Sequence, residues 1–401
     1  MHPERSTQKE AAPPAVVAVL ALAAALLAGV LVQTWPSHAH AEEAAPGGGE
    51  AAVASADADT GDDAEAELDL EALEEPPVTS NPHGGGAGIT AFDGAVKIMG
   101  RFDASYELTN PAKDDPGLRK GDIKSYHHHV FLKAAPSKQV GLFAEVVDGL
   151  FFEAAVKISS ALELKAGKIF VPFGDPGFHH FYAAVQGDPT TGILLPNIWS
   201  EYGASLGWDI GHIGPVAVKS ETYTVKGSFD RDPSRTLQLN RPATGNRFAV
   251  GERVTFRWDR VTFAGSAYWD EWNVGYDLFL YGADLSLDYG LVPVPFLSDL
   301  RFKGGIARAE VENGVTGNYY KYADYFELAY GGLREWVTPR LRYGSYIDDS
   351  RLITNKDLHN WSAALVVPVD VLTVTAEYLF QMEEVNEVDN DLFRLMVALD
   401  F

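Results

Sequence analysis

The sequence of 401 residues contains no cysteine, which excludes disulfide bridges and thiolate metal sites. Long apolar runs are also scarce. Only residues 15–32 approach the about 20 consecutive apolar residues that a membrane-spanning helix needs. These absences exclude a disulfide-stapled domain and a bundle of membrane helices.

The one apolar run has the surroundings of a secretory signal. It follows Arg5 and Lys9 and precedes the sequence Ala39-His40-Ala41. A basic start, an apolar run and an A-x-A site are typical of a signal peptide. We predict a signal peptide over residues 1–41 and export of the mature chain; a retained membrane anchor is the alternative reading of this long run.

Basic residues are missing from the segment that follows. Residues 42–75 hold thirteen Asp or Glu and neither Lys nor Arg, within a chain of formal charge −24. Such acidity excludes nucleic acid as a partner. Residues 42–91 have few apolar side chains to bury, so we expect a disordered, low-complexity segment, located in the periplasm if the chain reaches the outer membrane.

The last eleven residues, Asp391 to Phe401, place apolar side chains on one face of a strand and a partly polar set on the other. Side chains of a strand point to opposite faces with period two, so one face of this strand carries Phe393, Leu395, Val397, Leu399 and Phe401. An edge strand of a β-sandwich alternates similarly. A terminal strand that ends on a free Phe is, however, typical of the assembly signal of bacterial outer-membrane β-barrels, and it predicts recognition by the barrel-assembly machinery.

The same alternation recurs throughout residues 92–401 and predicts an all-β transmembrane barrel of about sixteen antiparallel strands. Strands in lipid must close into a barrel because no water satisfies a free edge. Connections are alternately long and short, as in outer-membrane barrels, except at 148–151 and 290–299. We place the strands at 95–107, 126–134, 139–147, 152–158, 161–170, 200–210, 214–226, 247–258, 261–270, 276–289, 300–309, 319–330, 337–346, 359–368, 371–382 and 391–401.

Residues 167–174 read G-K-I-F-V-P-F-G and precede the long third external connection. A strand that ends in this motif resembles the phosphate-selective porin O and P family. The resemblance implies sixteen strands, a homotrimer, a third loop folded into the pore, and anion selectivity. Residues 169–218 contain no Lys or Arg, and a phosphate filter needs a ring of positive charge. We therefore do not infer phosphate specificity from the resemblance. The residues predicted for the constriction loop are Asp175, His179, His180 and Asp188.

Basic residues two or four apart on the predicted strands share the polar, inward face. They form a candidate strip that favours anions: Arg253, Arg257, Arg301, Lys303, Arg340 and Arg342. Inward carboxylates are about as numerous, so the alternative is a balanced, solvated lumen.

The leading hypothesis is a porin: a passive channel for ions and small hydrophilic solutes in the outer membrane, in contact with lipid and lipopolysaccharide. We expect no enzymatic activity, metal or cofactor. One alternative is a phospholipase-like barrel, which needs Ser, His and Asn or Asp on the lipid-facing surface; His128, His212 and His359 are the candidate histidines. Another is an envelope tether or adhesin that uses residues 42–91.

Overall fold

The computed structural model describes the barrel part of the chain. The described residues are 89–91, 95–109, 120–125, 128–147, 149, 151–174, 194–195, 199–227, 248–273, 275–291, 294–314, 317–333, 336–351, 357–383 and 391–401. The predicted signal peptide and most of the predicted acidic segment lie outside these residues. Within them, no helix is long and apolar enough to cross a membrane.

Antiparallel strands make up nearly all of the regular structure in the described residues. Their bounds are β1 (Ile89–Ala91), β2 (Val96–Thr109), β3 (Lys120–Lys124), β4 (His128–Ala134), β5 (Val140–Glu145), β6 (Phe152–Lys157), β7 (Leu162–Phe170), β8 (Ser200–Ile213), β9 (Val216–Val225), β10 (Ala249–Trp258), β11 (Val261–Asn273), β12 (Tyr276–Leu287), β13 (Leu300–Val311), β14 (Tyr319–Tyr330), β15 (Thr338–Ile347), β16 (Leu358–Val369), β17 (Leu372–Glu383) and β18 (Leu392–Asp400). A single turn of 3-10 helix, Leu297–Asp299, precedes β13.

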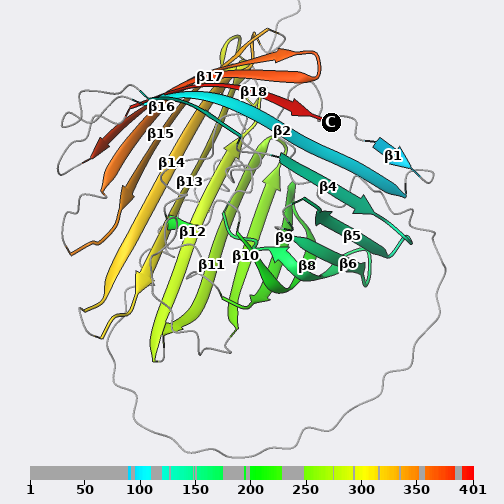
Figure 1. Cartoon of the computed structure of the whole chain (residues 1–401). Coiled ribbons are helices and arrows are strands. Elements are labelled where there is room, and N and C mark those ends of the chain that lie inside the picture. Colours follow the sequence, from blue (N-terminus) through cyan, green and yellow to red (C-terminus); the bar gives the residue numbers. More distant parts are fainter. Residues whose placement is uncertain are drawn as a thin grey trace, which may run out of the picture. The chain divides into compact units, whose positions relative to one another are not determined.

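The sheet closes on itself because the last strand, β18, pairs antiparallel with β2 (Figure 1). Although eighteen strands are labelled, they fill sixteen positions around the closed sheet. The barrel is therefore sixteen-stranded, which confirms the prediction. β3 and β4 share one place, since β3 pairs with the C-terminal part of β2 and β4 with its N-terminal part. β1 adds a short pairing to the start of β2.

β1 and β3 were not among the predicted strands. Residues 120–124, which the prediction leaves within a connection, form β3. The reason lies in strand length: β2 has 14 residues and β4 has 7. The part of β2 that extends past β4 would expose unpaired backbone groups, and β3 supplies their hydrogen-bond partners.

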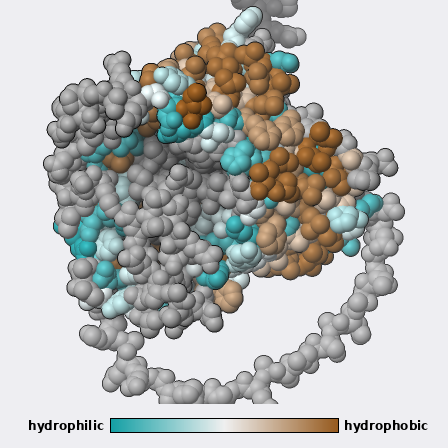
Figure 2. All heavy atoms as spheres, viewed as in Figure 1, coloured by the Kyte–Doolittle hydropathy of each residue, from teal (hydrophilic) through white to brown (hydrophobic). Residues whose placement is uncertain are grey.

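Alternation along the strands separates an apolar outer face from a polar inner face. On β2, Phe102 and Tyr106 are 41% and 43% exposed, whereas Asp103 and Ser105 between them are buried. Figure 2 shows hydrophobic atoms gathered on the outer wall around β2 and β4 to β6. This arrangement is the reverse of that in a soluble β-protein and matches a barrel with lipid outside.

The wall is low at one side of the ring. β4, β5 and β6 have 7, 6 and 6 residues, and Figure 1 shows them as short arrows beside the tall β10 to β14. A strand that spans a bilayer needs about 9–11 residues. These three strands are therefore too short to span the hydrocarbon layer by themselves.

The two ends of the barrel differ in their connections. We call the end with residues 135–139, 158–161, 214–215, 259–260, 288–299, 331–337 and 370–371 the short-turn end. At the opposite, long-connection end the described strands lead into and out of the connections 110–119, 146–151, 171–199, 226–248, 274–275, 312–318, 348–357 and 384–391.

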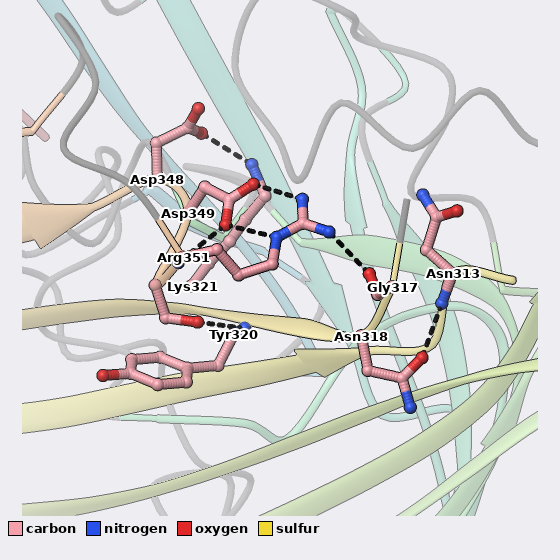
Figure 3. A network of polar contacts seen from close by, with 9 residues as sticks. Asn313, Gly317, Asn318, Tyr320, Lys321, Asp348, Asp349 and Arg351 are labelled. Carbon is pink, nitrogen blue, oxygen red and sulfur yellow. Dashed lines mark hydrogen bonds and ion pairs between the residues drawn. The ribbon is translucent and has the colours of Figure 1, made fainter. Parts of the chain in front are cut away.

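A polar network ties two connections together at the long-connection end (Figure 3). The Arg351 guanidinium donates to Asp349 Oδ1 at 2.9 Å and to the Gly317 carbonyl at 2.7 Å. The hydrogen bond from Arg351 lowers the pKa of the Asp349 carboxyl. Beside this pair, Lys321 Nζ lies 2.6 Å from Asp348 Oδ1. The network fixes the connection after β15 to the connection before β14.

Candidate functional site: the lumen of the barrel

Four of the six predicted basic residues converge on one carboxylate. Glu327 of β14 receives Arg342 Nη2 at 2.8 Å, Arg301 Nη2 at 3.3 Å and Arg340 Nη1 at 3.9 Å. Lys303 lies directly opposite Glu327 in the pairing of β13 with β14. We call these five residues the Glu327 cluster. Four cations surround one carboxylate, so the cluster is net cationic.

Strand pairing explains why these residues meet. Glu327 stands between Lys303 of β13 and Arg342 of β15 in one cross-strand row. Directly opposed side chains in adjacent antiparallel strands have Cβ atoms about 4.5–5.5 Å apart. The three arginines and Glu327 are buried in the inner wall, where Coulomb interactions are stronger than in water.

The other two residues of the predicted strip are separate from this cluster. Arg253 forms a two-pronged ion pair with Asp284, at 2.7 and 2.9 Å, and also donates to Ser266 Oγ at 3.0 Å. That pair is neutral overall. Arg257 is exposed and lies four residues further toward the short-turn end of β10. The single strip expected from the sequence is thus a cluster, a neutral pair and one exposed cation.

A second charged network crosses the closure between the first and last strands. Arg394 of β18 donates to Glu107 of β2 at 2.6 Å and to Glu377 of β17 at 3.0 Å. Lys124 of β3 also reaches Glu107, at 2.8 Å. Neither Arg394 nor Glu107 was predicted as a site residue, because their meeting depends on barrel closure.

The described ends of the third connection lie against the inner wall. Phe173 is buried, with its ring centroid 5.6 Å from that of Trp199. The backbone N–H of Gly174 donates to Ser266 Oγ of β11 at 3.2 Å. Leu194 belongs to the same apolar cluster, which we call the inner apolar shelf. Its members are Ile169, Val171, Phe173, Leu194, Leu195, Trp199, Tyr223, Val225, Ala249, Tyr268, Trp272, Leu278, Leu280, Ala307, Ala309, Val311, Ala323, Tyr346 and Leu358.

The shelf brings the chain inward on both sides of the predicted constriction loop, as the prediction of an inward-folded third connection requires. The loop residues themselves, Asp175, His179, His180 and Asp188, lie outside the described residues, so their role remains a prediction. A second inner cluster consists of Met99, Phe131, Phe143 and Phe151.

The C-terminal strand alternates as predicted. Leu395 and Val397 are exposed on the outer face, whereas Arg394 and Met396 are buried inside. Phe401 pairs with Gly100 through both backbone groups, at 2.8 and 3.0 Å, and its ring stacks on Phe102. The apolar face of Phe393, Leu395, Val397, Leu399 and Phe401 remains a predicted assembly signal.

One histidine considered for the enzyme alternative lies beside a serine and a carboxylate on the outer face. His359 is opposite Ser345 in the pairing of β15 with β16. The Ser345 hydroxyl donates to Asp324 Oδ2 at 2.9 Å, while His359 Nδ1 lies 3.0 Å from the Tyr343 hydroxyl. These hydrogen bonds join the serine to the carboxylate and the histidine to a tyrosine, whereas the relay of a hydrolase runs from serine to histidine to acid.

Comparison with known proteins supports the architecture. No protein-family model and no curated protein matches the sequence. The barrel is similar to the anion-selective porin from Comamonas acidovorans, with a TM-score of 0.52 and 11% identity over 76% of this chain and 99% of that chain. It is also similar to OmpF of Salmonella typhi in complex with daunomycin, with a TM-score of 0.51 and 10% identity over 78% of this chain and 100% of that chain. The chain therefore has the fold of Gram-negative outer-membrane porins.

Proposed function

We propose that this protein is an outer-membrane porin, a passive diffusion channel for ions and small hydrophilic solutes that prefers anions. The observation that carries the preference is the Glu327 cluster, in which four cations on the inner wall face one carboxylate. Fixed charge along a pore raises the local concentration of the opposite ion. Transport would be electrodiffusion, with no covalent step.

The first test is the reversal potential of the purified protein in a planar bilayer across a KCl gradient. We expect discrete conductance steps and a potential that favours chloride. The variant Arg340→Gln/Arg342→Gln should lower the chloride-to-potassium permeability ratio about two- to fivefold. At 0.1 M salt the Debye length is about 10 Å, so the charges of these arginines still act on ions that pass through the pore. Its matched control is Arg308→Gln, a change on the outer face. An unchanged ratio in the double variant would contradict the assignment.

We further propose that the subunits assemble as a homotrimer through the low wall of β4, β5 and β6. The support is that these strands are too short to span lipid and present apolar side chains outward, among them Leu142 and Val156. A second subunit would cover them without thinning the bilayer. Membership of the phosphate-selective porin O and P family, contact with lipopolysaccharide and recognition by the barrel-assembly machinery remain proposals that rest on residues 167–174 and on the terminal strand.

Oligomeric state can be tested with outward lysines. Ala154→Lys, on β6 in the low wall, should convert trimers into monomers in mass photometry of the detergent-extracted protein. A buried unpaired lysine costs several kcal/mol at a packed interface. The control Leu365→Lys, on the outer face of β16, should leave the trimer intact. A wild-type monomer, or a trimeric Ala154→Lys variant, would refute the interface.

The phospholipase-like alternative keeps one specific observation in its favour, the outward grouping of Asp324, Ser345 and His359. Hydrolysis of phospholipid by the wild-type protein, abolished in Ser345→Ala, would support it. Full conductance with no hydrolysis would remove it.

A further inference from the structure

Charged side chains on the inner wall are sorted along the barrel axis. In the half near the short-turn end, cations prevail. Besides the Glu327 cluster they include Lys97, Lys133, Lys157, Lys219 and Arg257. Carboxylates in this half are fewer: apart from Glu327 they are Glu163, Asp209, Asp284, Glu377 and Asp400. Three of these are paired across strands: Asp284 with Arg253, Asp400 with Arg101, and Glu377 with Arg394.

The half near the long-connection end has the opposite composition. Its inward carboxylates include Glu107, Glu145, Glu153, Glu201, Glu221 and Asp270. Its inward cations are fewer, namely Lys124, Arg253, Lys321 and Arg394. Three of them lie in contact with carboxylates at the same end of the barrel: Lys124 and Arg394 with Glu107, and Lys321 with Asp348.

The separation runs along the axis and not across the pore. Lys133 of β4, Lys219 of β9, Lys303 of β13 and Arg340 of β15 come from all sides of the ring, and all lie toward the short-turn end of their strands. Glu145 ends β5 at the opposite end. Away from the low wall of β4, β5 and β6, tilted strands of 9–14 residues give a wall about 30 Å high. Each half of this wall is longer than the Debye length of about 10 Å at 0.1 M salt, so the two fields do not cancel there.

We propose that this pore is an ionic rectifier. Our inference rests on the proposed channel function. The short-turn half enriches anions and the long-connection half enriches cations, so the two halves act as oppositely selective filters in series. We call the middle of the pore, where the two halves meet, the junction. At one polarity, anions enter through the half that enriches anions and cations enter through the half that enriches cations, so both ions accumulate at the junction. The reverse polarity depletes both ions there and lowers the conductance.

The direction of rectification follows from the geometry. With the long-connection side positive, cations enter through the carboxylate-rich half and anions enter through the cation-rich half. Both accumulate at the junction, so current is larger at this polarity. We expect a current ratio of about two- to fivefold between the two polarities at 0.05 M KCl. At 1 M KCl the Debye length is about 3 Å, and the ratio should approach one.

The experiment is a single-channel current–voltage curve of the full-length protein in symmetric KCl. Because the chain has no cysteine, the variant Gln139→Cys places one thiol at the exposed turn 135–139 of the short-turn end. Biotin-maleimide followed by streptavidin, added to one chamber, marks which side this end faces. Rectification of the expected sign at 0.05 M KCl, lost at 1 M KCl, supports the proposal. A symmetric curve at 0.05 M, or the opposite sign, overturns it.

Charge variants in each half provide a second readout. Glu153→Gln/Glu221→Gln should reduce the current ratio toward one and raise the preference for chloride. Lys157→Gln/Arg257→Gln, in the other half, should also reduce the ratio but lower that preference. Glu310→Gln, on the outer face, is the matched control and should leave the ratio unchanged. A symmetric curve with a chloride-favouring reversal potential would refute the rectifier alone, whereas rectification with a potassium-favouring potential would refute the anion preference alone.

Discussion

Glu327→Gln should destabilise the barrel strongly. Glutamine keeps the size of the side chain but removes the charge that compensates Arg301, Arg340 and Arg342, all buried in the wall. Breaking a buried ion pair by removing one partner costs about 3–5 kcal/mol. We therefore expect a large loss in the free energy of unfolding. It can be measured by urea titration in liposomes, with the heat-modifiable shift on gels as the readout.

Two further variants make this result interpretable. Glu163→Gln is the control, because Glu163 is part-exposed and its nearest cation, Lys165, lies 3.9 Å away. It should cost less than about 1 kcal/mol. Arg342→Gln combined with Glu327→Gln should recover part of the loss, since it removes the arginine at 2.8 Å. Equal free energies of unfolding for Glu327→Gln and wild type would show that water in the lumen stabilises the charged arginines without Glu327.

Phe173→Ala should raise the single-channel conductance and its noise. Phe173 is 1% exposed and holds the start of the third connection against Trp199 and the wall. Deleting a buried Phe side chain costs about 3–5 kcal/mol, more than the single hydrogen bond from Gly174 to Ser266 contributes. Without this contact, residues 171–174 would leave the inner apolar shelf for part of the time.

The same contact can be disturbed from the opposite side. A Cβ atom added at Gly282 of β12 would lie 3.3 Å from the Phe173 ring and 2.8 Å from the Ile306 carbonyl oxygen. Gly282→Val should therefore displace the ring and reproduce the increased noise. Phe152→Ala removes an outward phenylalanine, 47% exposed, and should leave conductance unchanged. Wild-type currents in both Phe173→Ala and Gly282→Val would show that other contacts hold the connection.

The sequence predicts the strands well because each strand is long enough for period-two alternation to emerge. All sixteen strand places correspond to predicted segments, with ends shifted by a few residues. β3 was missed because K-G-D-I-K shows no apolar stripe; it exists only to pair with the long β2. Backbone pairing demands can thus create a strand that side-chain patterning does not reveal.

The candidate site was predicted less completely. Inward orientation of Arg301, Arg340 and Arg342 follows from parity alone. Their convergence on Glu327 does not, because it requires the register between β13, β14 and β15. The inner apolar shelf was also not predicted. Leu278 and Leu280 alternate with their neighbours as in any half-buried strand. This pattern does not show whether the leucines face lipid outside the barrel or pack against a connection inside it.

The closure network sets the order of events when the barrel forms. Glu107 and Arg394 are 287 residues apart in the chain, and the seam between β2 and β18 joins the first long strand of the barrel to its last strand. The loop-closure entropy of so long a segment must be overcome before these contacts form. A chain that has lost its last strand would keep two open sheet edges, so we expect truncated products to be degraded or to aggregate and not to persist as smaller pores.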